Sequence, residues 1–479
     1  MKRLTRPEKA SKKVVMADIP MSELQGEAAT ESPNLGIIFL IGYVRQRMPD
    51  VNFYYLEPWM TKEEHFETVK KIKPDAYCIS FTTPKKKLAY ATIKSIRKML
   101  PDVTIVAGGA HPTIDPHEVL RESPTDICVV GEGEEVFFEL VRDGFKTGDK
   151  VKEASKLLDD IDFFPAWDMV TFDKYDIPLK RNSPIAYVLP SRGCPFKCAF
   201  CSNPVWKQRK PWIRQRTPKN VAEEVKFVHD TYGVREIYLR SDTFNSDITW
   251  ALKVCQEIEK LHLDDTAFQC QLRCDKVPEA LAEALKKIGC WLVHLGIESA
   301  NDRVLKGIRK YITRSDVIKT CETLKKHDIR AYGFFMLYNA WEENGKLEFE
   351  SNAEVEETLN FAKTLLGQNL LTYISWSIAN PIVGSELHII AEKYDLISDQ
   401  PFHPMRLPGI SEDEMVHNLR RGLQLQLQNG FDKGLISKND VRAIEKFRTL
   451  LELLALEDVL AEKSVERKAT KNRNDRVGK

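Results

Sequence analysis

The sequence predicts an α/β protein: an N-terminal doubly wound, flavodoxin-like parallel sheet, then a partial (β/α)6 barrel of the TIM type and a helical C-terminal region. The first observation is that, between residues 12 and 145, β-branched runs alternate with stretches whose apolar residues recur at i, i+3 and i+4. The second is a further series of strand–helix units that begins near residue 184. Strands that alternate with helices favour parallel sheets covered by helices.

The N-terminal sheet is expected to occupy residues 12–146. Its strands are expected at 12–18, 51–57, 76–82, 103–109 and 126–133, and its helices at 35–48, 63–73, 89–100 and 133–145. Residues 147–182 have no clear periodicity and contain Pro165 and Pro178, so they are expected to be a linker.

The barrel is expected to span residues 183–400. Its strands are expected at 184–193, 236–242, 268–275, 292–299, 331–339 and 372–381. Residues 401–463 have helical periodicity, and the polar, basic residues 464–479 are expected to form a disordered tail.

Composition limits the class of function. The 479 residues carry a net charge of +1, which gives no indication of nucleic acid or a membrane surface as a partner. No run approaches the roughly 18 apolar residues of a membrane-spanning helix, and the basic N-terminus lacks the features of a secretory signal. The 10 cysteines are mostly scattered singly, which favours reduced thiols in a cytoplasmic protein.

Cys194, Cys198 and Cys201 form a CxxxCxxC triplet in the stretch SRGCPFKCAFCSNP. A structural zinc site needs four ligands, and a redox dithiol would use CxxC alone. Three thiolates on a 4Fe–4S cluster leave one iron open for a small molecule. Cys270 and Cys274 could supply a fourth zinc ligand, but their spacing on a strand points both to one face, which favours packing. The cluster interpretation is favoured because no fourth cysteine follows at comparable spacing.

The triplet, in the loop after the first barrel strand, resembles the signature of radical S-adenosylmethionine (SAM) enzymes. Cys194, Cys198 and Cys201 match the cluster ligands, and Phe200 matches the aromatic residue before the third. The segments WIRQRTPKNVAEEV, SDTFNSD, LGIESANDRVLKGI and IANPIVGSEL resemble members with an N-terminal cobalamin-binding domain. SPNLGIIFLIGYV, AGGAHPT and VVGEGEEVFFELV resemble that domain. The resemblance covers roughly residues 12–400 and implies a 4Fe–4S cluster, SAM and cobalamin as cofactors.

Barrel strands are expected to set polar residues on one face against apolar residues on the other, because side chains alternate along a strand. The polar sets are Tyr238, Arg240 and Asp242; Gln271 and Arg273; and His294, Gly296 and Glu298. Strands covered by helices on both sides are normally apolar throughout, so polar faces favour a lined cavity; the alternative is polar groups satisfied by buried neighbours. The histidine among them is expected to be a core residue rather than a general base.

The resemblance also implies which residues meet SAM. Glu298 falls where the family holds the ribose, and Asp242 falls where it contacts the amino group. Arg273 has a planar fork suited to the carboxylate. Asn380 lies where backbone meets the adenine, and Phe200 adjoins the cluster. The catalytic residues themselves are unknown at this point.

Loops at the carboxyl ends of the N-terminal strands are expected to hold cobalamin. They offer glycines for close approach and hydroxyls for the cofactor's amide rim. The expected residues are Ser80, Thr82, Thr83, Gly108, Gly109, His111, Gly131 and Gly133.

Cobalt is expected to lack a histidine ligand from the protein. The stretch after the first strand has no DxHxxG histidine, the motif by which many cobalamin domains ligate cobalt. The nearest imitation contains His117 but ends in Leu120 instead of glycine, and it reads as a helix start capped by Asp115. His111 is the residue that could overturn this expectation.

By resemblance, the expected reaction is methylation of an unactivated carbon of a small-molecule or natural-product substrate, through a 5′-deoxyadenosyl radical and methylcobalamin. Anaerobic conditions and an electron donor such as flavodoxin or ferredoxin are expected with it. A radical oxidation or cyclisation without methyl transfer, as in anaerobic porphyrin cyclisation, remains an alternative. A cobalamin- or metal-binding regulator is the alternative from another class, and no nucleic-acid module supports it.

Overall fold

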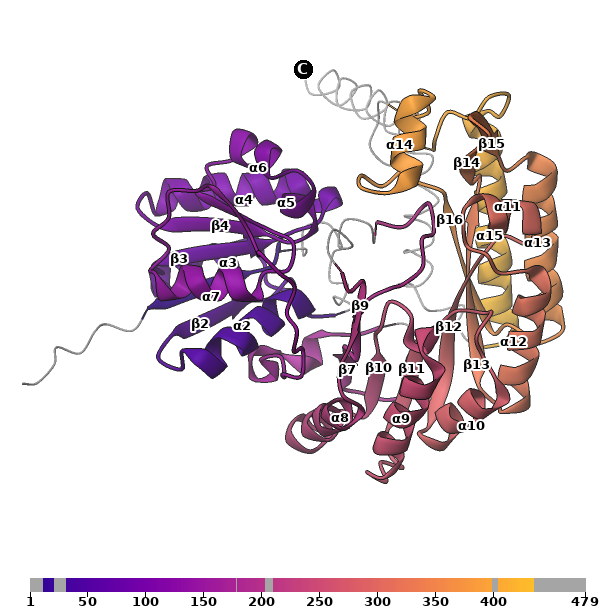
Figure 1. Ribbon diagram of the computed structural model, residues 1–479, viewed down its shortest axis with the longest axis horizontal. Helices are drawn as coiled ribbons and strands as arrows, with labels where there is room; N and C mark the ends of the chain where they lie inside the picture. Colours follow the sequence, from indigo (N-terminus) through magenta and orange to yellow (C-terminus); the bar gives the residue numbers. More distant parts are fainter. Residues whose placement is uncertain (1–11, 21–31, 178, 203–209, 399–403, 435–479) are drawn as a thin grey trace, which may run out of the picture.

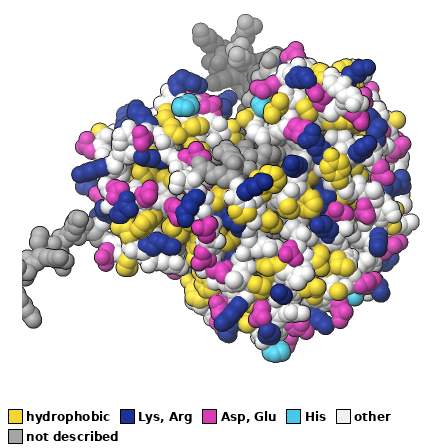
Figure 2. Space-filling model, viewed as in Figure 1, with side chains coloured by type: hydrophobic (Ala, Val, Ile, Leu, Met, Phe, Trp, Pro, Cys, Tyr) yellow, Lys and Arg dark blue, Asp and Glu magenta, His cyan; other side chains and the backbone are white. Residues whose placement is uncertain are grey.

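The computed structural model describes residues 12–20, 32–177, 179–202, 210–398 and 404–434, and it has two α/β parts (Figure 1). Charged side chains of both signs are interspersed over the face that Figure 2 shows, in keeping with the small net charge. Within the described ranges, no helix is both long enough and apolar enough to cross a membrane.

The N-terminal sheet is parallel, with strand order β2-β1-β3-β4-β5-β6. The strands are β1 (Lys13–Ala17), β2 (Asn52–Leu56), β3 (Ala76–Ser80), β4 (Thr104–Gly108), β5 (Ile127–Val130) and β6 (Val151–Glu153). The helices are α2 (Leu35–Arg47), α3 (Lys62–Ile72), α4 (Lys86–Met99), α5 (Ala110–Ile114), α6 (Pro116–Glu122) and α7 (Glu134–Arg142). The order of the first five strands confirms the flavodoxin-like prediction.

Both faces of this sheet are apolar, which is why it is covered on both sides. Val14 and Met16 pack in one core cluster with residues of α2 and α7. Val15 and Ala17, which alternate with them, pack in a second cluster with residues of α3 and α4. Ligands can therefore reach this sheet at the loops along its edge.

The second sheet is also parallel and follows chain order, β7-β10-β11-β12-β13-β16. Its strands are β7 (Ile185–Val188), β10 (Glu236–Leu239), β11 (Ala267–Leu272), β12 (Cys290–Glu298), β13 (Arg330–Leu337) and β16 (Tyr373–Ile378). The helices that follow are α8 (Pro218–Tyr232), α9 (Ile248–Glu259), α10 (Glu279–Lys287), α11 (Asp302–Gly307), α12 (Arg314–Lys326), α13 (Asn352–Gly367), α14 (Glu386–Lys393) and α15 (Glu412–Asp432). This is the predicted partial barrel.

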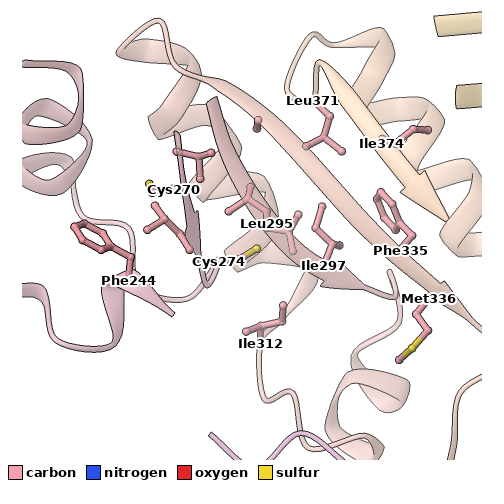
Figure 3. Close-up of a cluster of buried hydrophobic side chains, with 14 of the residues drawn as sticks. Phe244, Cys270, Cys274, Leu295, Ile297, Ile312, Phe335, Met336, Leu371 and Ile374 are labelled. Atoms are coloured by element: carbon pink, nitrogen blue, oxygen red, sulfur yellow. The ribbon is translucent and has the colours of Figure 1, made fainter. Parts of the chain in front are cut away.

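The outer face of the barrel sheet forms the largest hydrophobic core. Leu295 and Ile297 of β12 lie beside Phe335 of β13 and Ile374 of β16 (Figure 3). Cys270 belongs to the same cluster, and Cys274 follows β11 into it. The expectation that these two thiols serve packing is confirmed.

Two small antiparallel ribbons interrupt the alternation. β8 (Ser191–Gly193) pairs with β9 (Ile213–Gln215), so the strand expected at 184–193 is divided in two at Pro190. β14 (Ala340–Glu343) pairs with β15 (Lys346–Phe349) after the fifth barrel strand.

The segment expected to be a linker is packed between the two parts. The prediction missed β6, which extends the N-terminal sheet into this segment by pairing with β5. Further along, Glu57 accepts hydrogen bonds from the Thr171 backbone N–H at 3.0 Å and the Tyr175 hydroxyl at 2.8 Å. Trp167 donates its indole N–H to Glu224 of α8 at 2.8 Å. Of the expected C-terminal helices, α15 is observed; residues 435–463 and the expected tail lie outside the described residues.

Candidate active site

The cysteine loop leaves β8 through a position that requires glycine. Gly193 has φ +83°, and a Cβ there would lie 2.0 Å from the carbonyl oxygen of Trp212, the residue before β9. The next residue, Cys194, places its sulfur 3.3 Å from the Thr243 hydroxyl. The short ribbon of β8 and β9 therefore fixes where the loop starts, at the carboxyl ends of the barrel strands.

All three loop cysteines are half-buried and lie outside any disulfide, a donor set that suits an iron–sulfur cluster. Among the residues described, no three His, Cys, Asp or Glu side chains are gathered closely enough to hold a metal ion. Ligation of a cluster by these three thiols stays a prediction. Burial raises the pKa of the Cys198 thiol, against the opposing positive charges of Lys310 and Arg273.

A buried ion pair lies beside the loop. Glu298, at the end of β12, is 9% exposed and accepts a hydrogen bond from the Lys310 ammonium group at 2.9 Å. A Cβ on Gly296 would lie 2.7 Å from both charged groups, so glycine leaves the space that the pair occupies. Burial alone would lower the Lys310 pKa, but the Glu298 carboxylate raises it above its ordinary value. Lys310 therefore keeps its positive charge beside this carboxylate.

The side chain of Arg273 packs against the cysteine loop. Its guanidinium group lies 3.7 Å from the ring centre of Phe196, which is within the triplet. The same group bonds both carboxylate oxygens of Asp275, at 2.9 and 3.2 Å, and donates to the carbonyl oxygen of Lys310 at 2.7 Å. Most N–H donors of the Arg273 guanidinium group thus already have partners in the protein. The expected pairing of Arg273 with the SAM carboxylate stays a prediction.

The other residues expected at the SAM site lie around the same loop. Phe200 is half-buried, with the Lys310 ammonium nitrogen 6.0 Å from its ring centre. Asp242 and Asn380 are exposed at the carboxyl ends of β10 and β16. Their contacts with SAM remain predictions.

A cavity of about 520 Å³ lies between the two parts of the molecule. From the N-terminal edge it is lined by Ser80, Gly108, Gly109, Gly131 and Gly133, all expected cobalamin residues. From the barrel side it is lined, among others, by Leu189, Cys201 and Asp242. One space thus connects the loops expected to hold cobalamin with the cysteine loop.

His111, Thr82 and Thr83 are not among the lining residues. The two ring nitrogens of His111 are engaged by protein hydroxyls: Nδ1 lies 3.2 Å from Thr83 and Nε2 lies 2.9 Å from Tyr90. His117 is exposed on α6, and Asp115 caps that helix as expected. The arrangement agrees with cobalt lacking a histidine ligand, which stays a prediction.

Four charged residues at this cavity were missed by sequence reasoning. Arg192 bonds Glu132 at 2.6 Å and Glu134 at 2.7 Å, and Arg214 bonds the second oxygen of Glu132 at 2.8 Å. Burial opposes ionisation of Glu132, but the hydrogen bond from Arg214 and the charge of Arg192 hold its pKa below the ordinary value. These pairs tie the N-terminal edge to the ribbon of β8 and β9. The sequence feature that could have indicated these ion pairs is the presence of Arg192 and Arg214 on either side of the cysteine motif.

Family models match both parts of the chain: the radical SAM superfamily over residues 188–349 and the B12 binding domain over residues 24–141. An uncharacterized methyltransferase of Pyrococcus horikoshii is 32% identical over 385 residues, which cover 76% of this chain and 80% of the relative. The chain belongs to the cobalamin-dependent radical SAM methyltransferase family. The cofactors of this radical SAM enzyme are thus a 4Fe–4S cluster, SAM and cobalamin.

Two further comparisons bear on this radical SAM enzyme. An anaerobic magnesium-protoporphyrin IX monomethyl ester cyclase of Rubrivivax gelatinosus is 26% identical, covering 82% of this chain and 74% of the relative. The radical SAM methyltransferase TsrM from Kitasatospora setae, solved with cobalamin and a 4Fe–4S cluster, has a TM-score of 0.62 and 16% identity. That match covers 82% of this chain and 76% of TsrM, and it shows the shared fold.

Proposed function

We propose that this enzyme methylates an unactivated carbon of a small-molecule substrate. The observation that carries the proposal is the shared cavity, because Gly108 and Gly109 line it from the expected cobalamin edge and Cys201 lines it from the cysteine loop. When bound, the cluster with SAM supplies a radical that removes a substrate hydrogen, and cobalamin supplies the methyl group. The chain itself would bring the two cofactor sites to one space.

Different residues at the site would have different roles. The three loop thiols would hold the cluster, while Glu298, held by its hydrogen bond from Lys310, would accept hydrogen bonds from a sugar hydroxyl. The ion pairs of Glu132 and Glu134 with Arg192 would keep the N-terminal edge against the barrel. A cytoplasmic location, anaerobic conditions and a flavodoxin or ferredoxin as electron donor belong to the same proposal.

The test measures methyl transfer from SAM in the absence of substrate. Anaerobic, reduced protein loaded with all three cofactors is given SAM with a deuterated methyl group, and S-adenosylhomocysteine is quantified by mass spectrometry. A methyltransferase must form it as cobalamin is charged. Release of 5′-deoxyadenosine alone would instead favour oxidation or cyclisation, the alternative supported by the similarity to the Rubrivivax gelatinosus cyclase.

The cluster assignment is tested separately. Replacing Cys194, Cys198 and Cys201 together with alanine should abolish bound iron and sulfide after anaerobic reconstitution, and with them all cleavage of SAM. The control is Cys255→Ala, which removes a buried thiol of α9 that lies outside the loop and should leave iron content unchanged. Unchanged iron in the triple variant would refute the assignment.

A further inference from the structure

The inner face of the barrel sheet carries a continuous layer of rings. His294 of β12 lies between Tyr238 of β10 and Phe334 of β13, with ring centres 4.9 and 5.9 Å away and planes within 18° and 19° of parallel. Neighbouring strands continue the layer, which we call the ring-lined face. It consists of Tyr187, Tyr238, His294, Tyr332, Phe334 and Tyr373.

This layer differs from the core on the other side of the same strands. On the outer face, Leu295 and Phe335 are buried in the cluster of Figure 3. On the inner face Tyr238, Tyr332 and Phe334 remain half-buried. Half-buried rings arranged on one surface leave π-faces and edges open to a ligand, and aromatic rings favour stacked or edge-to-face partners.

His294 presents a neutral acceptor in this layer. Gln269 donates its side-chain N–H groups to Glu236 at 2.7 Å and to the carbonyl oxygen of Leu179 at 2.8 Å. Its amide oxygen therefore faces His294 Nε2 at 2.9 Å and assigns the proton to that nitrogen, which leaves Nδ1 as an acceptor. Burial, and then the charge of Arg240, lower the pKa of His294 to about 4. An N–H or hydroxyl group of a bound ligand could donate a hydrogen bond to Nδ1 of His294 at neutral pH.

Arg240 adds a cation without a counter-charge. It follows Tyr238 on the same face of the chain, its guanidinium group lies 5.4 Å from the ring centre of Tyr187, and it is exposed. Arg192, Arg214 and Arg273 are all paired with carboxylates. Arg240 has no such partner among the residues that the structure describes. An unpaired guanidinium beside an aromatic surface suits a ligand with a carboxylate or phosphate.

The ring-lined face also adjoins the cavity between the two parts. Asp242, two residues beyond Arg240, lines that cavity, and so does Leu189, which follows β7. A molecule on the ring-lined face would therefore lie next to the space shared by cobalamin and the cysteine loop.

We propose that the ring-lined face is the substrate site and that it takes a planar aromatic molecule bearing an anionic group, with the rings packing on the substrate and Arg240 pairing with its anion. The proposal rests on the methyl-transfer function proposed above, because that function requires a substrate beside the shared cavity. It names the chemical class of the substrate.

The experiment measures binding without turnover. Unreduced enzyme loaded with cluster and cobalamin is titrated by calorimetry with three probes: 2-naphthoate, the uncharged 2-naphthol and the non-aromatic anion cyclohexanecarboxylate. We expect 2-naphthoate to bind at least about ten-fold more tightly than either of the others, because it alone has both features. Equal binding of 2-naphthoate and 2-naphthol would overturn the role of the anion.

Variants separate the two contributions. Arg240→Gln should weaken 2-naphthoate about ten-fold or more and leave 2-naphthol unchanged, and Arg240→Lys should recover part of the loss. Phe334→Leu should weaken both aromatic probes. The control Arg121→Gln changes an exposed arginine of α6 in the N-terminal part and should change nothing. Unaltered 2-naphthoate affinity in Arg240→Gln, with an unchanged circular dichroism spectrum, would overturn the proposal.

The binding result and the methyl-transfer result are independent. S-adenosylhomocysteine formation without selective naphthoate binding would discard the substrate class alone. Selective binding without S-adenosylhomocysteine would discard methyl transfer and leave an aromatic-anion site in a cyclase or oxidase.

Discussion

The two parallel sheets of this enzyme differ in what lies on their faces. The N-terminal sheet is apolar on both sides, with Val14 in one core cluster and Val15 in the other. The barrel sheet is apolar on its outer side, where Leu295 packs, and polar or aromatic on its inner side, where His294 lies. The first sheet can offer a ligand only its edge loops, while the second offers a whole face.

This difference explains the kinds of residue at each candidate site. At the N-terminal edge the cavity lining includes glycines of the edge loops, such as Gly108, Gly109 and Gly131, where a large cofactor can approach the backbone closely, among apolar side chains such as Leu40 and Phe137. Inside the barrel the candidate site consists of side chains that project from strands, and their neighbours on adjacent strands fix their positions. The predictions below test this contrast, from the largest expected effect to the smallest.

Truncating a side chain should destabilise the protein on either face of the N-terminal sheet, but only on the outer face of the barrel sheet. Leu295→Ala should cost about 2–5 kcal/mol in the free energy of unfolding, because the fully buried side chain leaves a cavity. Gln271→Ala, on the half-buried inner face of the neighbouring strand, should stay within about 0.5 kcal/mol. In the N-terminal sheet, Val14→Ala and Val15→Ala should each cost about 2 kcal/mol. Urea unfolding measures all four, and a costly Gln271→Ala would contradict the contrast.

Glu298→Gln should weaken SAM binding and leave the cluster intact. The variant loses a charge-assisted hydrogen bond worth about 1.5–3 kcal/mol, which corresponds to roughly ten- to 150-fold in Kd. It also leaves the Lys310 ammonium without its carboxylate. Equilibrium dialysis with SAM measures the affinity, and cluster absorbance serves as the integrity check. The control is Glu343→Gln on the exposed hairpin. Affinity equal to that of the wild type would remove Glu298 from the SAM site.

His111→Ala should leave the cobalt centre unchanged. Both of its ring nitrogens face protein hydroxyls, from Thr83 and Tyr90, so neither is available to the metal. Protein loaded with Co(II) cobinamide, which has no nucleotide base of its own, should show no nitrogen splitting in its electron paramagnetic resonance spectrum. The His111→Ala and His117→Ala variants should give the same spectrum. Splitting that vanishes in either variant would mean that the protein does supply the lower ligand.

Much of the fold could be predicted from the sequence, because each strand and helix is specified by the pattern of neighbouring residues. Strand and helix periodicity located the strands of the two parallel sheets except β6, and in β12 the alternation placed His294, Gly296 and Glu298 on one face. The strand that was missed, β6, has three residues and no apolar run to mark it. The cysteine triplet was recognisable because its ligands lie within eight positions of one another.

What the sequence alone determined is the succession of elements, the outward and inward faces of the strands, and the three thiols expected to hold the cluster. What the tertiary structure decided is which charges meet. Lys310 pairs with Glu298, Arg192 pairs with Glu132 across 60 positions of sequence, and Arg240 lies over the ring of Tyr187. The reason is physical: periodicity is a property of neighbouring residues, whereas an ion pair depends on the closure of loops that bring distant strands together.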